Sequence, residues 1–255
     1  MLETAIEAAR QVGQILLEKF GKSHEIRNKG LRDIVTEADL AAQAKAIEVI
    51  RSQYPDHDIW AEEVSQTPDG ASDYCWIVDP LDGTTNYARG FPCFSVSLAL
   101  SHRGELILGV VYDPLRDQLF RAQHGQGAYL NDDVIQVSAA ERLMDAVIGL
   151  DWAREQELRS QMAQLVAEIA PGVWTLRSAG SAALALCSVA AGWTDAYFHL
   201  SLKPWDVAAS SVIIQEAGGA ISDLAGRPWC PGSGDCLASN GLIHTAMLNF
   251  MKTET

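Results

Sequence analysis

Apolar residues in the first part of the chain recur with the period of an amphipathic helix. Between residues 2 and 20 they fall at spacings of three and four, and Gly21 follows as a helix stop. A second helix is predicted from Thr36 to about Gln53, because a carboxylate stands three residues after Thr36, as in a capping box. We therefore expect two helices before the first strand.

The hydrophobic pattern changes to a period of two in the next part of the chain. Two short apolar runs, 58–61 and 75–79, come first, and apolar and small polar residues then alternate across 94–100. An Arg-Gly pair separates this run from 106–112, and an Asp-Pro pair separates the latter from 118–122. Turn residues between such runs predict an antiparallel meander.

The second half of the chain alternates between short apolar runs and helical patterns, which predicts a sheet with crossover helices. The runs are 146–150, 173–176, 195–198, 219–222 and 236–239, and the helical stretches are 155–170, 181–191, 204–217 and 241–252. We predict one compact unit with an α+β half, residues 1–140, which carries the chemical motif described below, and an α/β half, residues 141–255. The two halves are expected to share a cleft.

Composition narrows the function classes. The 255 residues are 48% apolar, which is enough for a large core and excludes a disordered chain. With 33 acidic and 19 basic residues the net charge is -14, so we expect neither a nucleic-acid partner nor a membrane partner. The five cysteines lack zinc-site spacing and predict free thiols. An acidic N-terminus without a long apolar run predicts a cytoplasmic protein.

The densest chemical signal is WIVDPLDGTTN at residues 76–86. An apolar strand delivers Asp79 to its end, Pro80 ends the strand ladder, and Gly83 permits an unusual backbone angle. Two carboxylates three residues apart, Asp79 and Asp82, can converge on one point, and Mg²⁺ requires clustered oxygen ligands. The alternative for this segment alone is an Asx-type turn with two solvated acids.

Two further acidic residues stand at the ends of predicted elements. Glu62 follows the run 58–61, where a solvated loop would be the default. Asp206 opens a predicted helix, where a carboxylate can also simply complement the helix dipole. Together with Asp79 and Asp82 these acids would repel one another strongly unless cations neutralised them. The pattern therefore favours a metal site built from separated segments.

The segment that begins at Gly83 supplies the anion side of the same site. If a helix starts here, its free amides and positive end face the metal ligands, which suits a phosphate group. The sequence contains no P-loop, nucleophile elbow, metalloprotease or kinase motif. Its six histidines are scattered without paired spacing, so a histidine-based zinc hydrolase is not indicated.

At these residues the sequence resembles the inositol monophosphatase family of Mg²⁺-dependent, lithium-sensitive phosphatases. The resemblance rests on the segments 76–86 and 205–219, WDVAASSVIIQEAGG, and is supported by DIVTEAD at 33–39, AEE at 61–63 and RSAGSAALALC at 177–187. It implies a layered α-β-α-β-α sandwich with an antiparallel first sheet and a mixed second sheet. It also implies a homodimer that binds Mg²⁺ and hydrolyses a small-molecule phosphate monoester, with inositol 1-phosphate as the leading substrate.

The resemblance implies a role for each matching residue. The metal ligands would be Glu62, Asp79, the Leu81 carbonyl, Asp82 and Asp206. Thr84 paired with Asp39 would orient and deprotonate a water molecule bound to the metal, and Glu62 would belong to the same catalytic set. The substrate-binding residues would be Leu81, Asp82, Gly83, Thr84, Gly180, Ser181, Ala182, His199 and Asp206. The cations would activate the water and stabilise the attacking and leaving oxygens, so no catalytic histidine is required.

One position departs from the family pattern. Inositol-hydrolysing relatives commonly have a glutamate where this chain has His199, and an imidazole could favour a second anionic group on the substrate. The other interpretation is that His199 points at solvent or replaces one hydrogen-bonding group by another. Fructose-1,6-bisphosphatase activity, another sugar or nucleotide phosphatase activity, and a regulatory binding protein on the same fold therefore stay open as alternatives.

Overall fold

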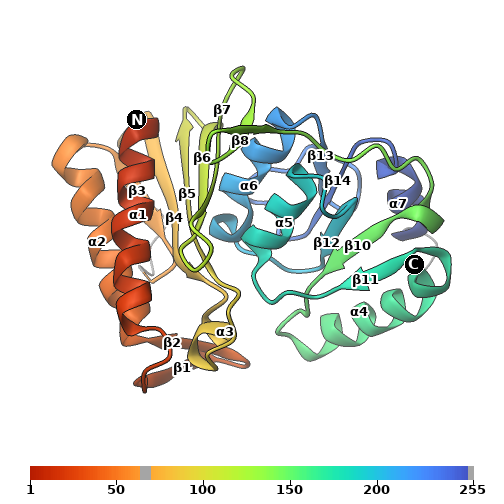
Figure 1. Cartoon of the computed structure of the whole chain (residues 1–255), viewed down its shortest axis with the longest axis horizontal. Coiled ribbons are helices and arrows are strands. Elements are labelled where there is room, and N and C mark those ends of the chain that lie inside the picture. The colour runs from red at the N-terminus through yellow and green to blue at the C-terminus, as the bar shows by residue number, and fades with distance from the viewer. Residues whose placement is uncertain (64–69, 252–255) are drawn as a thin grey trace.

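The computed structural model describes residues 1–63 and 70–251. Its helices and sheets form five layers in the order α-β-α-β-α, which confirms the predicted layered sandwich (Figure 1). The outer layer on one side is α1 (Leu2–Lys19) with α2 (Glu37–Gln53). The central layer is α5 (Ala182–Ala190) with α6 (Pro204–Glu216), and the far layer is α4 (Gln156–Ile169) with α7 (His244–Met251).

A seven-stranded sheet lies between the outer pair α1/α2 and the central pair α5/α6. Its strands run in chain order as β3 (Asp58–Ala61), β4 (Tyr74–Asp82), β5 (Ser95–His102), β6 (Glu105–Asp113), β7 (Gln118–Gln123), β8 (Ala128–Leu130) and β9 (Asp133–Ile135). The predicted meander is present as β5, β6 and β7. The sheet is antiparallel except for β3 and β4, which pair in parallel. Because β3 and β4 are parallel, Glu62 after β3 and the acids at the end of β4 lie at the same end of the sheet.

The second sheet has five strands in the order β11-β10-β12-β14-β13. They are β10 (Val147–Leu150), β11 (Thr175–Arg177), β12 (Ala196–His199), β13 (Ala220–Ser222) and β14 (Cys236–Ser239). Strands β10, β11 and β12 are parallel to one another, whereas β14 runs antiparallel to both of its neighbours, β12 and β13. This is the sheet with crossover helices that the alternation predicts, and its mixed strand directions are those that the family resemblance implies.

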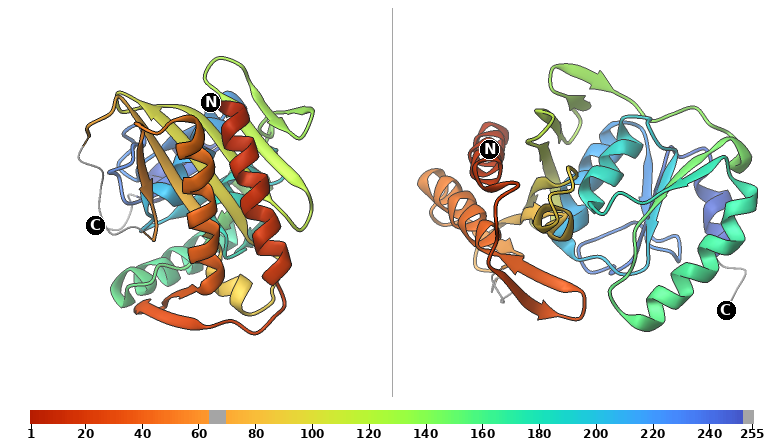
Figure 2. Two further views of the ribbon diagram at one scale, coloured as in Figure 1. Left: turned by 90° about the vertical axis from the view of Figure 1, so that its left-hand side faces the viewer. Right: turned by 60° about the horizontal axis from the view of Figure 1, so that its bottom comes forward.

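The expectation of two helices before any strand is wrong. A hairpin of β1 (Ile26–Gly30) and β2 (Asp33–Thr36) stands between α1 and α2. All five residues of β1 are exposed, so no alternation of buried and exposed positions marks the strand in the sequence. Figure 2 shows the hairpin reaching beneath the first sheet toward the end of α4. The structure also contains two three-residue strands, β8 and β9, that the sequence pattern did not predict, and a short helix, α3 (Thr84–Ala88), follows the turn at Gly83.

The central helix α6 packs unusually close to the first sheet. A Cβ atom on Gly109 of β6 would lie 2.1 Å from the backbone oxygen of Ala209 in α6, so only glycine fits at this crossing. Every α6 residue from Val207 to Ile214 is buried between the two sheets. This close packing holds the start of α6, which carries Asp206, against the strand ends of the first sheet.

The five cysteines are free thiols, as their spacing predicts, and Cys187 and Cys236 are buried. Within residues 1–63 and 70–251, no helix combines the length and the apolar character needed to cross a membrane.

Candidate metal and phosphate site

Three carboxylates from two distant parts of the chain meet at the edge of the first sheet. Asp79 and Asp82 lie at the end of β4, and Asp206 lies in the first turn of α6. One carboxylate oxygen of each lies within 4.8 Å of the others. Asp79 and Asp82 are buried and Asp206 is half-buried, and such a set of oxygen ligands has the chemistry that a hard divalent cation requires.

Burial raises the pKa values of all three carboxyl groups, and repulsion by neighbouring acids adds to this rise. For Asp79, burial is the largest cause, and the charges of Glu62, Asp82 and Asp206 raise its pKa further. Burial also raises the pKa of Asp206 and of Asp82. Clustered acids whose ionised forms are this unfavourable gain most from a bound cation, because the cation removes both penalties.

Asp82 is fixed by donors from the start of α5. Its carboxylate accepts hydrogen bonds from the Ser181 hydroxyl and from the backbone N–H groups of Ala182 at 3.2 Å and Ala183 at 3.1 Å. The Ser95 hydroxyl donates a further bond at 3.2 Å. These hydrogen bonds favour the ionised carboxylate and set its orientation. The predicted substrate residues Ser181 and Ala182 therefore touch the site through Asp82.

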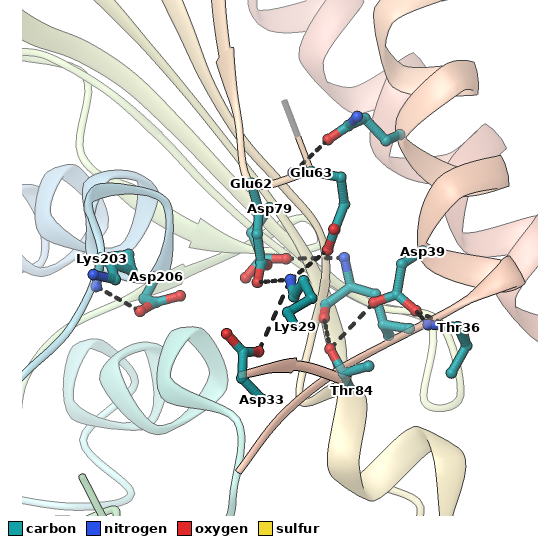
Figure 3. A network of polar contacts seen from close by, with 12 residues as sticks. Lys29, Asp33, Thr36, Asp39, Glu62, Glu63, Asp79, Thr84, Lys203 and Asp206 are labelled. Atoms are coloured by element: carbon teal, nitrogen blue, oxygen red, sulfur yellow. Dashed lines mark hydrogen bonds and ion pairs between the residues drawn. The ribbon is translucent and has the colours of Figure 1, made fainter. Parts of the chain in front are cut away.

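Glu62 emerges beside Asp79, as the parallel register of Ala61 with Val78 requires, but its carboxylate is engaged elsewhere. The Lys29 Nζ of the β1–β2 hairpin lies 2.7 Å from Glu62 and 2.7 Å from Glu63 (Figure 3). Burial alone would lower the pKa of Lys29, but these two partners outweigh it and raise the pKa. The structure thus places the predicted ligand Glu62 next to the three-acid group and pairs it with the ammonium group of Lys29.

Thr84 stands between a carboxylate and a carbonyl. Its Oγ1 lies 3.2 Å from Asp39 Oδ1 and 3.1 Å from the Leu81 oxygen. The other Asp39 oxygen accepts hydrogen bonds from the Thr36 N–H at 2.8 Å and the Thr36 hydroxyl at 2.6 Å, which completes the predicted capping box of α2. Burial raises the pKa of Asp39, and the Thr36 bonds oppose the rise. The helix cap therefore holds a buried acceptor against the Thr84 hydroxyl (Figure 3).

The turn between Asp82 and α3 requires glycine. Gly83 has a φ of 90°, and a Cβ atom there would lie 3.0 Å from the Cys93 oxygen and 3.2 Å from the Gly180 oxygen. Left-handed backbone of this kind carries a penalty for other residues. The first amides that follow have no acceptor within their own helix, as at any helix start.

A cavity of about 850 Å³ opens over these groups and is lined from both halves of the chain. Its lining includes the predicted residues Glu62, Asp79, Leu81, Asp82, Gly83, Thr84, Gly180, Ala182, His199 and Asp206. Of the remaining predicted residues, Ser181 contacts Asp82 and Asp39 contacts Thr84 from behind this lining.

Sequence reasoning missed charged residues in and beside this cavity, among them Lys29, Arg154 and Asp151. Lys29 pairs with Glu62, Arg154 pairs with Asp33 at 2.8 Å, and Asp151 lines the wall beside Gly180. Asp151 follows the apolar run 146–150 directly, so the strand-end argument that found Asp79 could have found it. No local pattern marks the two basic residues.

The fold and the site together define a layered α-β-α-β-α sandwich with a cluster of carboxylates that could hold a metal ion. The model of the inositol monophosphatase family matches residues 1–252, and the chain belongs to this family. The Nus factor SuhB of Haemophilus influenzae is 40% identical over 254 residues, which cover 98% of this chain and 94% of that protein.

Solved structures agree with this assignment. The crystal structure of the extragenic suppressor protein suhB from Bartonella henselae matches with a TM-score of 0.94 and 32% identity, covering 99% of this chain and 98% of that one. The IMPase of Thermotoga maritima matches with a TM-score of 0.91 and 35% identity over 98% of this chain and 96% of that one. Both likenesses extend across all five layers.

Proposed function

We propose that this protein is a Mg²⁺-dependent phosphoric monoester hydrolase whose leading substrate is inositol 1-phosphate. The observation that carries the proposal is the convergence of Asp79, Asp82 and Asp206 beside a glycine turn and a hydroxyl–carboxylate pair. These are the parts that phosphoryl transfer needs, because the reaction depends mainly on positioning and charge neutralisation.

The donor set fits Mg²⁺, since it consists of oxygen atoms from carboxylates and a carbonyl and contains no sulfur or nitrogen ligand. Asp79, Asp82, Asp206 and the Leu81 carbonyl would hold the ion, and Glu62 would join them. When bound, Mg²⁺ supplies positive charge that activates water and stabilises the oxygens of the transferred phosphoryl group.

The protein's own groups perform the positioning. The Thr84 hydroxyl can hold the attacking water in line, and Asp39 behind it can take the proton that leaves through the hydroxyl. The amides of Gly83 and Thr84 can bind phosphate oxygens, as free amides in a glycine turn do. The four donors on Asp82 keep this carboxylate from turning when substrate enters.

The alcohol part of the substrate would lie against Gly180, Ser181, Ala182 and His199. The family resemblance favours inositol there, and fructose 1,6-bisphosphate and nucleotide phosphates are the competing substrates. The same resemblance leads us to propose inhibition by lithium and a homodimer.

The test is a phosphate-release panel with inositol 1-phosphate, fructose 1,6-bisphosphate and 3′-phosphoadenosine 5′-phosphate in Mg²⁺. We expect inositol 1-phosphate to be hydrolysed with the highest kcat/KM and the Asp79→Asn variant to be inactive on all three. Asp113→Asn, which alters a buried aspartate outside the cavity, is the matched control and should retain activity. Activity of Asp79→Asn equal to wild type would refute the proposal.

A second candidate is a regulatory role, which the name Nus factor SuhB among the similar proteins favours. A regulatory factor would act by binding a partner, and that partner could include protein or nucleic acid despite the net charge of -14. Complementation of a deletion strain separates the two candidates. Full rescue by Asp79→Asn would favour regulation, whereas rescue by wild type alone would favour hydrolysis.

A further inference from the structure

A further buried carboxylate in the cavity, that of Asp151, is not one of the three that converge at the candidate metal site. Asp151 follows the end of β10, is 9% exposed and lines the cavity from the second sheet. Among the residues that the structure describes, no lysine, arginine or histidine forms an ion pair with it. A buried charge held only by neutral donors is unfavourable for stability, so a carboxylate at this place points to function.

One oxygen of Asp151 serves the fold. Oδ1 accepts hydrogen bonds from the Gly180 N–H at 2.8 Å and the Ser178 hydroxyl at 2.9 Å. These bonds hold the 178–180 turn, whose Ala179 oxygen in turn accepts a hydrogen bond from Asn86 at 2.8 Å. The turn is thereby fixed between the second sheet and the glycine turn at Gly83.

The other oxygen of Asp151 has acceptor capacity left. Oδ2 accepts a hydrogen bond from the Tyr197 hydroxyl at 3.3 Å, which is long for an O–H···O bond. Each carboxylate oxygen offers about two acceptor sites. Because Asp151 and Tyr197 both line the cavity, the remaining site is available to a bound molecule.

His199, which lines the same cavity, is already engaged in hydrogen bonds. Its Nδ1 accepts a hydrogen bond from the Ser201 N–H at 2.9 Å, and the Trp152 backbone provides a second hydrogen bond. Burial lowers its pKa to about 4, so the ring is neutral at pH 7. The wall therefore presents a carboxyl group with free acceptor capacity and a neutral ring, which suits hydroxyl groups better than a second phosphate.

Three of the basic residues that line the cavity are also engaged within the protein. Arg154 pairs with Asp33 at 2.8 Å, and Arg32 donates to the Arg154 backbone oxygen at 2.7 Å. Arg159 donates to the Ala153 oxygen at 3.2 Å and lies 5.2 Å over the ring of Trp152. These side chains join the hairpin and α4 to the cavity rim.

We propose that Asp151 determines specificity by accepting a hydrogen bond from a hydroxyl group on the alcohol part of the substrate. The proposal rests on the proposed function and deepens it, because it selects monophosphates of uncharged polyols over bisphosphates. The carboxylate that recognises the alcohol thus comes from the end of β10. His199 at the end of β12 forms part of the pocket wall and limits the shape of the group that can bind.

The test compares wild type, Asp151→Asn and Asp151→Ala on inositol 1-phosphate and on p-nitrophenyl phosphate, which has no hydroxyl group. In Asp151→Asn the amide oxygen can still accept from Gly180 and Ser178, while an NH₂ group replaces Oδ2. We expect kcat/KM for inositol 1-phosphate to fall at least tenfold through KM. Turnover of p-nitrophenyl phosphate and the Mg²⁺ concentration for half-maximal activity should stay within twofold. Asp145→Asn, at an exposed position outside the cavity, is the matched control.

The possible results separate the two proposals. An equal fall with both esters, or a weaker response to Mg²⁺, would show that Asp151 only positions the 178–180 turn and would overturn the specificity role. A wild type that prefers fructose 1,6-bisphosphate, with no gain for Asp151→Asn on that substrate, would overturn it as well. A wild type inactive on every ester would refute the proposed hydrolase function itself, and this role with it.

Discussion

Replacing Asp79 by Asn should stabilise the metal-free protein while removing its response to Mg²⁺. The substitution keeps the size of the side chain, and the amide oxygen can still accept the hydrogen bond from the Leu81 N–H, which is 3.0 Å long in the wild type. What it removes is one negative charge from a group whose oxygens lie within 4.8 Å of one another.

The magnitude follows from Coulomb's law. Two unit charges about 5 Å apart repel by about 3 kcal/mol at an effective dielectric constant of about 20. Protonation already relieves part of this repulsion, because burial and the neighbouring acids raise the pKa of Asp79. We therefore expect the free energy of unfolding of the metal-free variant to rise by about 1–3 kcal/mol at pH 8.

The sign of the pH dependence follows from the same shift. A carboxyl group whose pKa is raised by folding stabilises the native state at low pH, and this contribution disappears as the pH rises through its folded-state value. The advantage of Asp79→Asn over wild type should therefore grow from pH 5 to pH 8.

Urea unfolding in EDTA and in Mg²⁺ measures both effects. Mg²⁺ at one hundred times its Kd should stabilise the wild type by about 2.7 kcal/mol and the variant by far less. The control Asp113→Asn should lose stability, because Asp113 accepts hydrogen bonds from the Leu115 N–H at 2.9 Å and from Arg116 at 2.6 Å. It should keep the full Mg²⁺ response. A metal-free Asp79→Asn less stable than wild type, or stabilised equally by Mg²⁺, would refute the reasoning.

Three further predictions concern single residues. His199→Gln should reduce the loss of stability that the wild type shows between pH 6.5 and pH 4. Burial lowers the pKa of His199 to about 4, so the free energy of unfolding of the wild type falls by up to about 3 kcal/mol as the pH drops through this window. Urea unfolding against pH checks this, with the exposed His124→Gln as control; equal slopes for all three proteins would contradict it. Thr84→Ala should lower kcat at least about a hundredfold with an unchanged half-saturating Mg²⁺ concentration, and steady-state kinetics that show full turnover would exclude the role of its hydroxyl. Gly83→Ala should lower the free energy of unfolding by about 1–3 kcal/mol more than Gly90→Ala. Both glycines have positive φ, but of the two only Gly83 has backbone atoms close to the position of a Cβ atom. Equal losses in thermal unfolding would show that this close contact is unimportant.

The sequence predicts those parts of the fold whose signals are local. The cap of α2 is an example, because Thr36 and Asp39 are three residues apart and complete the capping box by themselves. The hairpin β1–β2 lacks such a signal, since every residue of β1 is exposed and its pairing depends on contacts with the rest of the chain. Strands β8 and β9, with three residues each, are too short to establish a period.

The site divides in the same way. Asp79 and Asp82 are joined by one turn, and their convergence follows from three residues of spacing. Asp206 joins them only because α6 packs closely against β6 at Gly109, a contact that no local pattern reveals. Lys29 reaches Glu62 across 33 positions of sequence, and its partner depends on the path of the hairpin. Such contacts follow from topology, so the sequence alone could suggest the acidic residues of the cluster but not the groups that surround them.

The most direct test of the account is phosphate release from inositol 1-phosphate by the purified protein while Mg²⁺ is titrated from an EDTA-treated start. The account predicts no release without metal, a saturable rise in turnover with Mg²⁺, and a midpoint that matches the Mg²⁺-induced gain in stability. Turnover that is independent of Mg²⁺, or no turnover at concentrations where Mg²⁺ fully stabilises the protein, would contradict it.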